Sequence, residues 1–190
     1  VEGEGEDALP ADGRGREQLA APPVPQREHG RSGKVNRRQQ RAVAAVAVGG
    51  EGGSLLASVD LAQSPLLALW DWRRGQLLAS ACVGRQRVLA LAFNPASGAL
   101  VSCARRQLRF WSCEAGRLRS RRALFGEGAA HTVLSVAFSA SGRTMLCATA
   151  AGALLHWSGG RCVQALQVNR RRPLFAVHVG PQGVLAAGKG

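Results

Sequence analysis

The amino-acid sequence predicts an all-β fold assembled from repeated units of four short strands. A pattern of apolar and polar residues recurs at intervals of about 41 to 45 residues, a period typical of repeat architectures. Each copy contains short apolar runs separated by turn-forming residues, and in three copies a tryptophan closes the third run. The connections between runs are too short for helices and lack a 3.6-residue periodicity, which disfavours alternating strands and helices.

The repeat is clearest in its first strand, where residues follow the order apolar-x-x-apolar-x-apolar before a turn. Four segments show this order: Val43–Val48, Val88–Phe93, Val133–Phe138 and Leu174–Val179. A second apolar run follows in each copy, at Leu55–Val59, Leu100–Cys103, Met145–Ala148 and Val184–Ala187. The third runs end at Trp70, Trp111 and Trp157, and we expect fourth strands at Gln76–Val83, Leu118–Phe125 and Cys162–Val168.

Four short strands with a tryptophan at the end of the third are typical of a WD-repeat β-propeller blade. The near-continuous apolar first strands fit the position nearest the central channel, where we expect burial on both faces. Residues 43–190 supply about three and a half blades, whereas closure takes ~4–8, so the sequence predicts an incomplete propeller. The aromatic residues expected in the blade cores are Trp70, Trp111, Trp157, Phe93 and Phe138.

The first 41 residues differ in composition from the rest of the chain. They contain no Ile, Phe, Trp, Tyr, Met or Cys. A segment with so little apolar surface to bury cannot offset the entropy of ordering its backbone. We therefore expect residues 1–41 to form a disordered low-complexity tail and residues 42–190 to form the partial WD-repeat propeller.

Positive charge is concentrated in the expected propeller, where 17 basic residues face 5 acidic ones. A surface of this kind favours polyanionic partners. In a four-stranded meander, the turn between strands two and three shares a rim with the connection to the next blade. The arginines expected to contact an acidic partner on that rim are Arg85, Arg87, Arg105, Arg106, Arg170, Arg171 and Arg172, with Arg121 and Arg122 placed there less securely. The alternative is that they only keep the surface soluble.

The opposite rim is expected to carry less net charge. Its basic residues are Arg73, Arg74, Arg117, Arg143 and Arg161, and its acidic residues are Glu51, Asp71 and Glu114. We therefore expect the two rims to differ in their attraction for a polyanion. Trp72 lies just beyond the tryptophan of its repeat and is a candidate contact for a partner.

The sequence does not indicate an enzyme, a cofactor or a metal. Three of the four histidines, His131, His156 and His178, lie in the expected propeller and lack the mutual spacing of metal ligands. Cys103 and Cys147 occupy equivalent strand positions, which favours small buried side chains over nucleophiles. The five cysteines form no CxxC pair, so a reduced intracellular protein is expected. The apolar runs are too short to span a bilayer, and we expect no membrane partner.

A resemblance to a known family covers roughly residues 43–190. The motifs that carry it are Trp70-Asp71-Trp72, Phe93-Asn-Pro, Leu108–Ser112, Ala123–Gly126, Val133–Gly142 and Leu185–Lys189, in that order. This series resembles the echinoderm microtubule-associated protein-like family, where a similar run lies in the first half of a tandem atypical propeller. The family's preceding hydrophobic motif and N-terminal coiled coil have no counterpart here, so oligomerisation would need regions absent from this sequence.

The repeats depart from the ordinary WD pattern in the turn between strands two and three. An aspartate usually stands there and ties the turn to a neighbouring histidine. This sequence has Ala104–Arg106 in the second repeat and Ala148–Ala150 in the third. Asp60 in the first repeat is the one residue expected to fill the role.

The resemblance implies a microtubule-associated scaffold that binds tubulin and contributes to organising the microtubule cytoskeleton in the cytoplasm. Other proteins are further expected partners. One alternative is a generic WD-repeat scaffold for protein–protein interactions. A second alternative is a basic propeller that binds nucleic acid, which we disfavour because the arginines are not interleaved with aromatic residues for base stacking.

Overall fold

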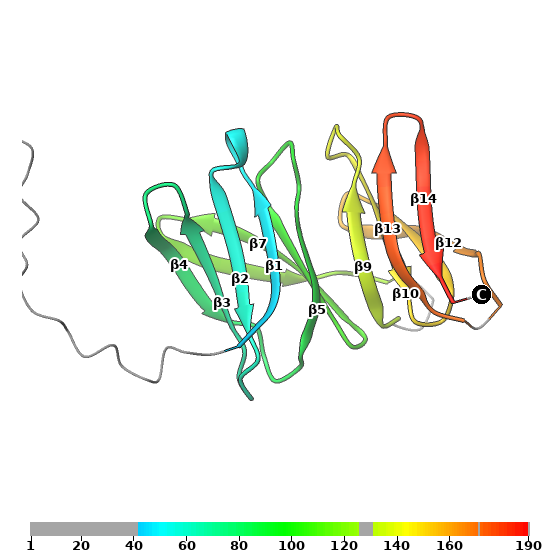
Figure 1. Ribbon diagram of the computed structural model, residues 1–190, viewed down its shortest axis with the longest axis horizontal. Helices are drawn as coiled ribbons and strands as arrows, with labels where there is room; N and C mark the ends of the chain where they lie inside the picture. The colour runs from blue at the N-terminus through cyan, green and yellow to red at the C-terminus, as the bar shows by residue number, and fades with distance from the viewer. Residues whose placement is uncertain (1–41, 126–130, 171, 190) are drawn as a thin grey trace, which may run out of the picture. The chain divides into compact units, whose positions relative to one another are not determined.

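Each predicted repeat forms one antiparallel sheet in the computed structural model of the chain (Figure 1). Blade 1 contains β1 (Val43–Gly49), β2 (Leu55–Asp60), β3 (Leu66–Asp71) and β4 (Gln76–Cys82). Blade 2 contains β5 (Val88–Phe93), β6 (Leu100–Ala104), β7 (Gln107–Glu114) and β8 (Arg117–Arg122). Blade 3 contains β9 (Val133–Phe138), β10 (Thr144–Thr149), β11 (Ala153–Ser158) and β12 (Arg161–Gln167). A two-stranded half-blade follows, with β13 (Leu174–Gly180) and β14 (Gly183–Gly188).

The structure describes residues 42–125, 131–170 and 172–189, which belong to one compact unit. Within each four-stranded sheet the strands neighbour one another in sequence order. This is the meander expected of propeller blades, and three such sheets plus the half-blade confirm the predicted all-β, partial-propeller fold. The expected tail at residues 1–41 lies outside the described residues.

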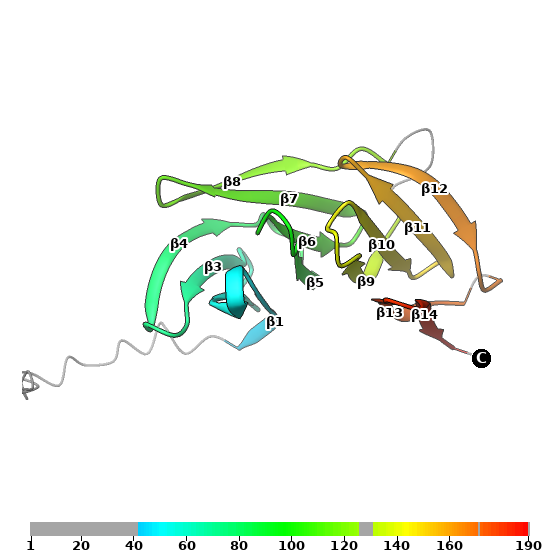
Figure 2. The same ribbon diagram turned by 90° about the horizontal axis from the view of Figure 1, so that it is seen from above.

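The first strands of successive blades lie side by side. β1 contacts β5, β5 contacts β9, and β9 contacts β13. Figure 2 shows these four strands along one side of the array and the fourth strands β4, β8 and β12 along the other. The pairing of β13 with blade 3 includes a hydrogen bond from the Val177 N–H to the Ser135 hydroxyl, at 3.2 Å.

Neighbouring blades share their cores. One buried cluster joins Val59 and Leu67 of blade 1 to Phe93 and Trp111 of blade 2. A second joins blade 2 residues, among them Leu108, to blade 3 residues that include Met145, Leu155 and Trp157. Burial of apolar surface stabilises a fold by ~25 cal/mol per Å², so each blade is stabilised mainly by contact with the next one.

The first strands are less buried than the sequence predicts. In β5 only Val88 and Phe93 are buried, and the four residues between them are half-buried. The expectation of burial on both faces is therefore wrong. Its physical reason is that each first strand is the edge of its own sheet and hydrogen-bonds a neighbour on one side only.

The fourth strand of blade 2 also differs from the expected Leu118–Phe125. β8 ends at Arg122, after which Leu124 forms a bridge with Arg161 of blade 3. The Phe125 ring then packs edge-on against Trp157, with ring centroids 5.0 Å apart. An aromatic ring in the outermost strand would face solvent, so the packing of Phe125 against Trp157 is favoured, although Leu124 stays 59% exposed.

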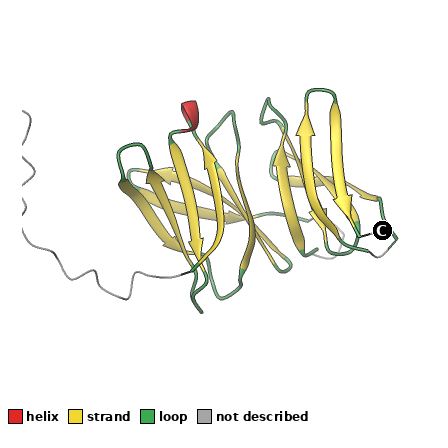
Figure 3. Cartoon of the chain, in the orientation of Figure 1, coloured by secondary structure: helices red, strands yellow, loops and turns green. Residues whose placement is uncertain are grey.

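Turns and one short helix connect the strands. In the described part of the chain the helical element is the 3-10 turn η2 (Glu51–Gly53), between β1 and β2 (Figure 3). The sheets at either end of the described array expose apolar side chains, which include Val46 and Val48 in β1, Phe175 in β13 and Leu185 in β14. Exposed apolar patches of this kind are typical of contact surfaces.

Candidate protein-interaction surface

The turns between second and third strands lie at the same end as the links between blades. The Val83 N–H, in the link after blade 1, donates to the Pro65 carbonyl at 3.0 Å. The Val168 and Asn169 N–H groups, at the end of blade 3, donate to the Gly152 carbonyl at 3.1 and 3.0 Å. Both of these links are thus held against the turn beside them.

We call this end the basic rim. Its described arginines are Arg85 and Arg87 in the β4–β5 link, Arg105 and Arg106 in the β6–β7 turn, and Arg170 and Arg172 in the β12–β13 link. All six are exposed. Within residues 42–125, 131–170 and 172–189, none of the six forms an ion pair. Arg171 lies outside the described residues. The six guanidinium groups are therefore available to an outside acceptor.

A hollow of about 350 Å³ brings part of this rim together. The β4–β5 link contributes Gln86, the β6–β7 turn contributes Arg106 and Gln107, and Arg122 and Phe125 complete the wall. Arg85 and Arg87 flank Gln86 in the same link. Arg170 and Arg172 lie further along the rim, in the link that packs against the Gly152 turn of blade 3. The arginines of the rim therefore form two groups. The β4–β5 link and the β6–β7 turn carry the first group, which lies around the hollow, and the β12–β13 link carries the second.

Arg106 has a left-handed backbone conformation, with φ 54°. This conformation costs a residue with a side chain roughly 1–2 kcal/mol, a cost that glycine avoids. Strained residues of this kind cluster at functional sites. Arg106 is therefore the candidate contact residue that the structure marks most clearly within the basic rim.

An acidic residue neutralises part of the opposite rim, which carries the turns between first and second and between third and fourth strands. Asp71 forms an ion pair of 3.1 Å with Arg74. The Arg73 guanidinium donates to the Gly52 carbonyl at 2.6 Å and lies 5.9 Å from the centre of the Trp72 ring. Trp72 is 51% exposed, and its Nε1 donates to Gly53 O at 2.7 Å. Arg73 and Arg74 are therefore already engaged within the chain.

The five aromatic residues expected in the blade cores are not equally buried. Trp111 and Trp157 are 3% and 1% exposed, and Phe93 is also buried. Trp70 and Phe138 are half-buried. These positions support the blades and do not reach the basic rim.

Sequence reasoning missed two polar roles. The indole nitrogens of Trp70 and Trp111 donate to the hydroxyls of Ser58 and Ser102, at 3.1 and 2.8 Å. In both blades the serine stands two residues after the residue that pairs with the tryptophan on the neighbouring strand. That spacing is the sequence pattern that could have predicted the hydrogen bond. In blade 3, the Thr149 hydroxyl accepts from the Ala153 N–H at 3.0 Å and donates to its carbonyl at 2.8 Å. Thr149 closes the turn where an aspartate was sought.

Asp60 closes the corresponding turn of blade 1. Its carboxylate accepts hydrogen bonds from the backbone N–H groups of Ala62 and Leu66, at 3.3 and 2.9 Å. Blade 2 makes its turn with two residues, Arg105 and Arg106, between the paired residues Ala104 and Gln107. A turn this short leaves no loop for a side chain to close, which accounts for the missing aspartate in blade 2.

The buried thiols have little nucleophilic character. Burial raises the pKa of Cys103 well above its usual range, and it raises the pKa of Cys147 for the same reason. Both thiols are therefore protonated at neutral pH. In the described residues, His, Cys, Asp and Glu form no group of three or more that could hold a metal ion. The helical segments described there include none with the length and apolar character needed to cross a bilayer.

Four-stranded antiparallel blades that share cores through adjacent first strands define a WD-repeat β-propeller scaffold. The fold is similar to the crystal structure of the Myceliophteria thermophila Cps50 (Swd1) β-propeller domain, with a TM-score of 0.65 and 15% sequence identity. The likeness covers 77% of this chain and 49% of that chain. No family model matches the sequence.

Within that class, the sequence is similar to echinoderm microtubule-associated protein-like proteins. It is 32% identical over 155 residues to echinoderm microtubule-associated protein-like 1 of Rattus norvegicus. It is 31% identical over 155 residues to echinoderm microtubule-associated protein-like 2 of Mus musculus. Each match covers 79% of this chain, but 19% and 24% of the respective relative. Cilia- and flagella-associated protein 44 of Chlamydomonas reinhardtii is 33% identical over 147 residues, or 75% of this chain and 8% of that protein. The resemblance to the echinoderm microtubule-associated protein-like family is confirmed, over a fraction of its members' length.

Proposed function

We propose that this chain is a microtubule-associated scaffold that binds tubulin through its basic rim. The observation that carries the proposal is the set of six exposed, unpaired arginines described there, on a chain whose relatives are named as microtubule-associated proteins. The proposed role is to contribute to the organisation of the microtubule cytoskeleton in the cytoplasm, without catalysis and without a cofactor.

The chemistry of the rim suits an acidic polymer. A guanidinium group forms two parallel hydrogen bonds with a carboxylate, and it stays charged at any physiological pH. Exposed charges act additively on a polyanion at low salt. At physiological ionic strength the Debye length is ~8 Å, and charges separated by more than this distance are largely screened. Binding through this rim should therefore weaken steeply as salt is raised.

Microtubule co-sedimentation tests the proposal. The chain is sedimented with and without microtubules at several salt concentrations, because its exposed apolar faces require a control for self-association. We expect microtubule-dependent pelleting that falls with salt and that polyglutamate inhibits. A single-stranded oligonucleotide of equal charge is the second competitor. Stronger competition by the oligonucleotide would favour nucleic-acid binding and contradict the proposal.

A general scaffold for other proteins is the second candidate. It is favoured by Trp72, an exposed aromatic residue with an arginine stacked beside it. Exposed Trp and Arg are the residue types that contribute most to protein–protein binding. Microtubule-independent capture of a partner that Trp72→Ala abolishes would support this candidate.

A further inference from the structure

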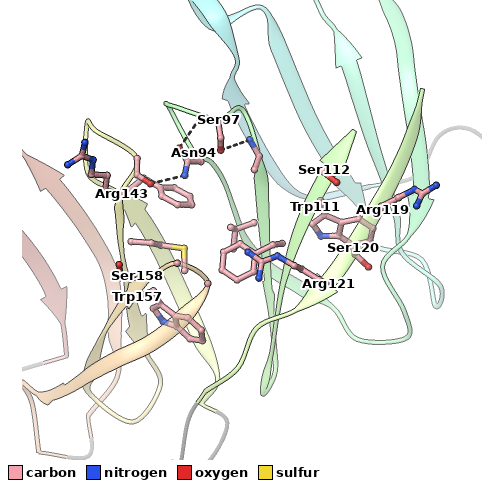
Figure 4. A pocket seen from close by; sticks show the side chains of 18 residues that line it. Asn94, Ser97, Trp111, Ser112, Arg119, Ser120, Arg121, Arg143, Trp157 and Ser158 are labelled. Carbon is pink, nitrogen blue, oxygen red and sulfur yellow. Dashed lines mark hydrogen bonds between the residues drawn. The ribbon is translucent and has the colours of Figure 1, made fainter. Parts of the chain in front are cut away.

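A cleft of about 500 Å³ lies between blades 2 and 3 (Figure 4). Apolar side chains from both sheets line it, and four of them are buried in the shared core: Val101 and Trp111 of blade 2, and Met145 and Trp157 of blade 3. The cleft therefore has an apolar floor that both blades supply.

Arginines line the mouth of this cleft. Arg119 and Arg121 come from β8, and Arg143 comes from the β9–β10 turn. Figure 4 shows Arg121 extending from β8 into the space between the blades, with Arg119 and Arg143 on either side. None of the lining residues is acidic. Glu114 lies nearby, with its carboxylate 3.9 Å from the Arg119 side chain, and offsets part of that charge.

The Arg121 guanidinium is held in place without using its hydrogen bonds. It lies over the Phe110 ring, 4.7 Å from the ring centre. Within the described ranges of the chain, no acceptor hydrogen-bonds this guanidinium. A Cβ at Gly160 would come 2.7 Å from one of its nitrogens, so the glycine makes room for it. Arg121 is thus stacked on one face and open to a ligand at its edge.

The two walls of the cleft are fixed relative to each other. The Asn94 amide of blade 2 donates to the Gly142 carbonyl of blade 3 at 2.8 Å. Its oxygen accepts from the backbone N–H groups of Ala96 and Ser97, at 2.9 and 3.2 Å. Gly142 has φ +67° and no space for a side chain next to Asn94. A preformed cleft avoids part of the ordering cost of binding.

We propose that this cleft binds an acidic peptide segment of a partner protein. One carboxylate of the peptide forms two hydrogen bonds with Arg121, and a neighbouring aliphatic or aromatic side chain packs against the half-buried Phe138 that also lines the cleft. The site goes beyond the proposed function, because its residues differ from those of the basic rim and its ligand is a short peptide rather than a polymer surface.

Charge and shape favour a peptide over a nucleic acid. One guanidinium satisfies one carboxylate with paired hydrogen bonds, whereas single-stranded nucleic acid needs open aromatic faces on which bases stack. Arg121 covers Phe110, and Trp111 and Trp157 are buried in the blade cores. The aromatic residues of the cleft therefore offer an apolar floor rather than stacking platforms.

The test uses the full chain and a dye-labelled decapeptide in which glutamate alternates with leucine and phenylalanine. Fluorescence anisotropy measures its affinity for the unmodified chain and for three variants. Arg121→Gln removes the charge, Ser158→Phe fills the mouth from an exposed lining position, and Arg117→Gln, at an exposed position of the same strand outside both the cleft and the hollow, is the matched control. We expect about tenfold weaker binding for Arg121→Gln, the size of a lost charge-assisted hydrogen-bonding pair, a comparable loss for Ser158→Phe, and less than about a twofold change for the control.

Three outcomes would overturn the proposal. Equal losses in Arg121→Gln and Arg117→Gln would show that binding follows overall charge. An unchanged affinity for a peptide with glutamine in place of glutamate would show that the cleft does not recognise the acid. Displacement of the peptide from the cleft by an oligonucleotide at lower concentration than by unlabelled peptide would assign the site to nucleic acid. These outcomes do not depend on microtubule binding, so failure here is distinguishable from failure of the proposed function.

Discussion

The indole nitrogen of Trp111 donates a buried hydrogen bond of 2.8 Å to the hydroxyl of Ser102. Trp111 pairs with Leu100 on the neighbouring strand, and Ser102 lies two residues beyond Leu100. In blade 1 the equivalent pair is Trp70 and Ser58. In blade 3 the equivalent of the serine is Cys147, two residues beyond Met145, which pairs with Trp157. The Trp157 Nε1 is a buried nitrogen without a hydrogen-bond partner in the described residues. Blade 3 therefore lacks a hydrogen bond that its two neighbours have.

Replacing Cys147 by serine should supply this bond. A net intramolecular hydrogen bond contributes ~0.5–1.5 kcal/mol, so we expect Cys147→Ser to raise the free energy of unfolding by about 1 kcal/mol, measured by urea denaturation. Ser102→Cys is the matched reverse change and should lower it, because it leaves the Trp111 indole without its acceptor. A Cys147→Ser variant less stable than the unmodified chain would contradict this reading of the repeat.

Truncating Trp111 should be among the most damaging changes in the chain. Its ring is buried in the core that blades 1 and 2 share, and Trp→Ala at such a site costs ~3–5 kcal/mol. Trp70→Ala at the equivalent, half-buried position of blade 1 should cost less. Urea denaturation of the two variants provides the comparison. Equal stability of Trp111→Ala and the unmodified chain would show that the strand register is wrong.

Stability should fall as the solution becomes alkaline. Burial raises the pKa of Cys103 and Cys147 in the folded chain, so the folded state holds these protons more tightly than the unfolded state. Their contribution is complete below the unfolded pKa of ~8.5 and is lost as pH rises above it, by up to ~1.4 kcal/mol per pH unit for each thiol.

The chain suits this measurement because it contains no tyrosine and only two lysines. Urea denaturation at pH 7.5 and pH 9.5 should show the loss, and Cys103→Ala should reduce the difference between the two pH values. The same free energy of unfolding at both pH values would contradict the burial of the two thiols.

Replacing Arg106 by glycine should separate binding from stability. The change removes a guanidinium from the basic rim and relieves the left-handed strain at this residue, so we expect weaker microtubule binding together with stability that is unchanged or up to about 1 kcal/mol higher. Arg106→Ala loses the same charge but keeps the strain. It should bind as weakly as the glycine variant without gaining stability. Loss of stability in Arg106→Gly would show that the arginine side chain supports the turn.

The periodicity of the sequence was enough to predict the blades, because each strand carries its own apolar pattern and each turn its own glycine or polar residue. It was not enough to place Ala123–Phe125. Those residues continue the apolar character of a strand, yet they leave β8 and Phe125 packs against Trp157 of blade 3 while Leu124 stays exposed. That choice depends on the neighbouring Trp157, which lies far along the chain and becomes a neighbour only in the folded structure.

The surface was predicted in part. Strand parity places the described arginines of the basic rim in links and turns, as expected. It does not show that Asp71 forms an ion pair with Arg74 or that Glu114 forms one with Arg119. Nor does it settle the place of Arg121, which was placed on the basic rim less securely than the other arginines and which lies in β8, in the wall of the cleft between blades 2 and 3. Twisting of each sheet turns the outermost strand toward the next blade, and a linear pattern of residues does not record that rotation.

The most direct test of the account is a comparison of the two rims in microtubule co-sedimentation at low salt. One variant carries Arg105→Glu and Arg106→Glu in the basic rim, and the other carries Arg73→Glu and Arg74→Glu in the opposite rim, with folding of both checked by urea denaturation. We expect the first variant to lose most of its microtubule-dependent pelleting and the second to keep most of it. Equal loss from both variants, or loss from neither, would contradict the assignment of the basic rim as the tubulin-binding surface.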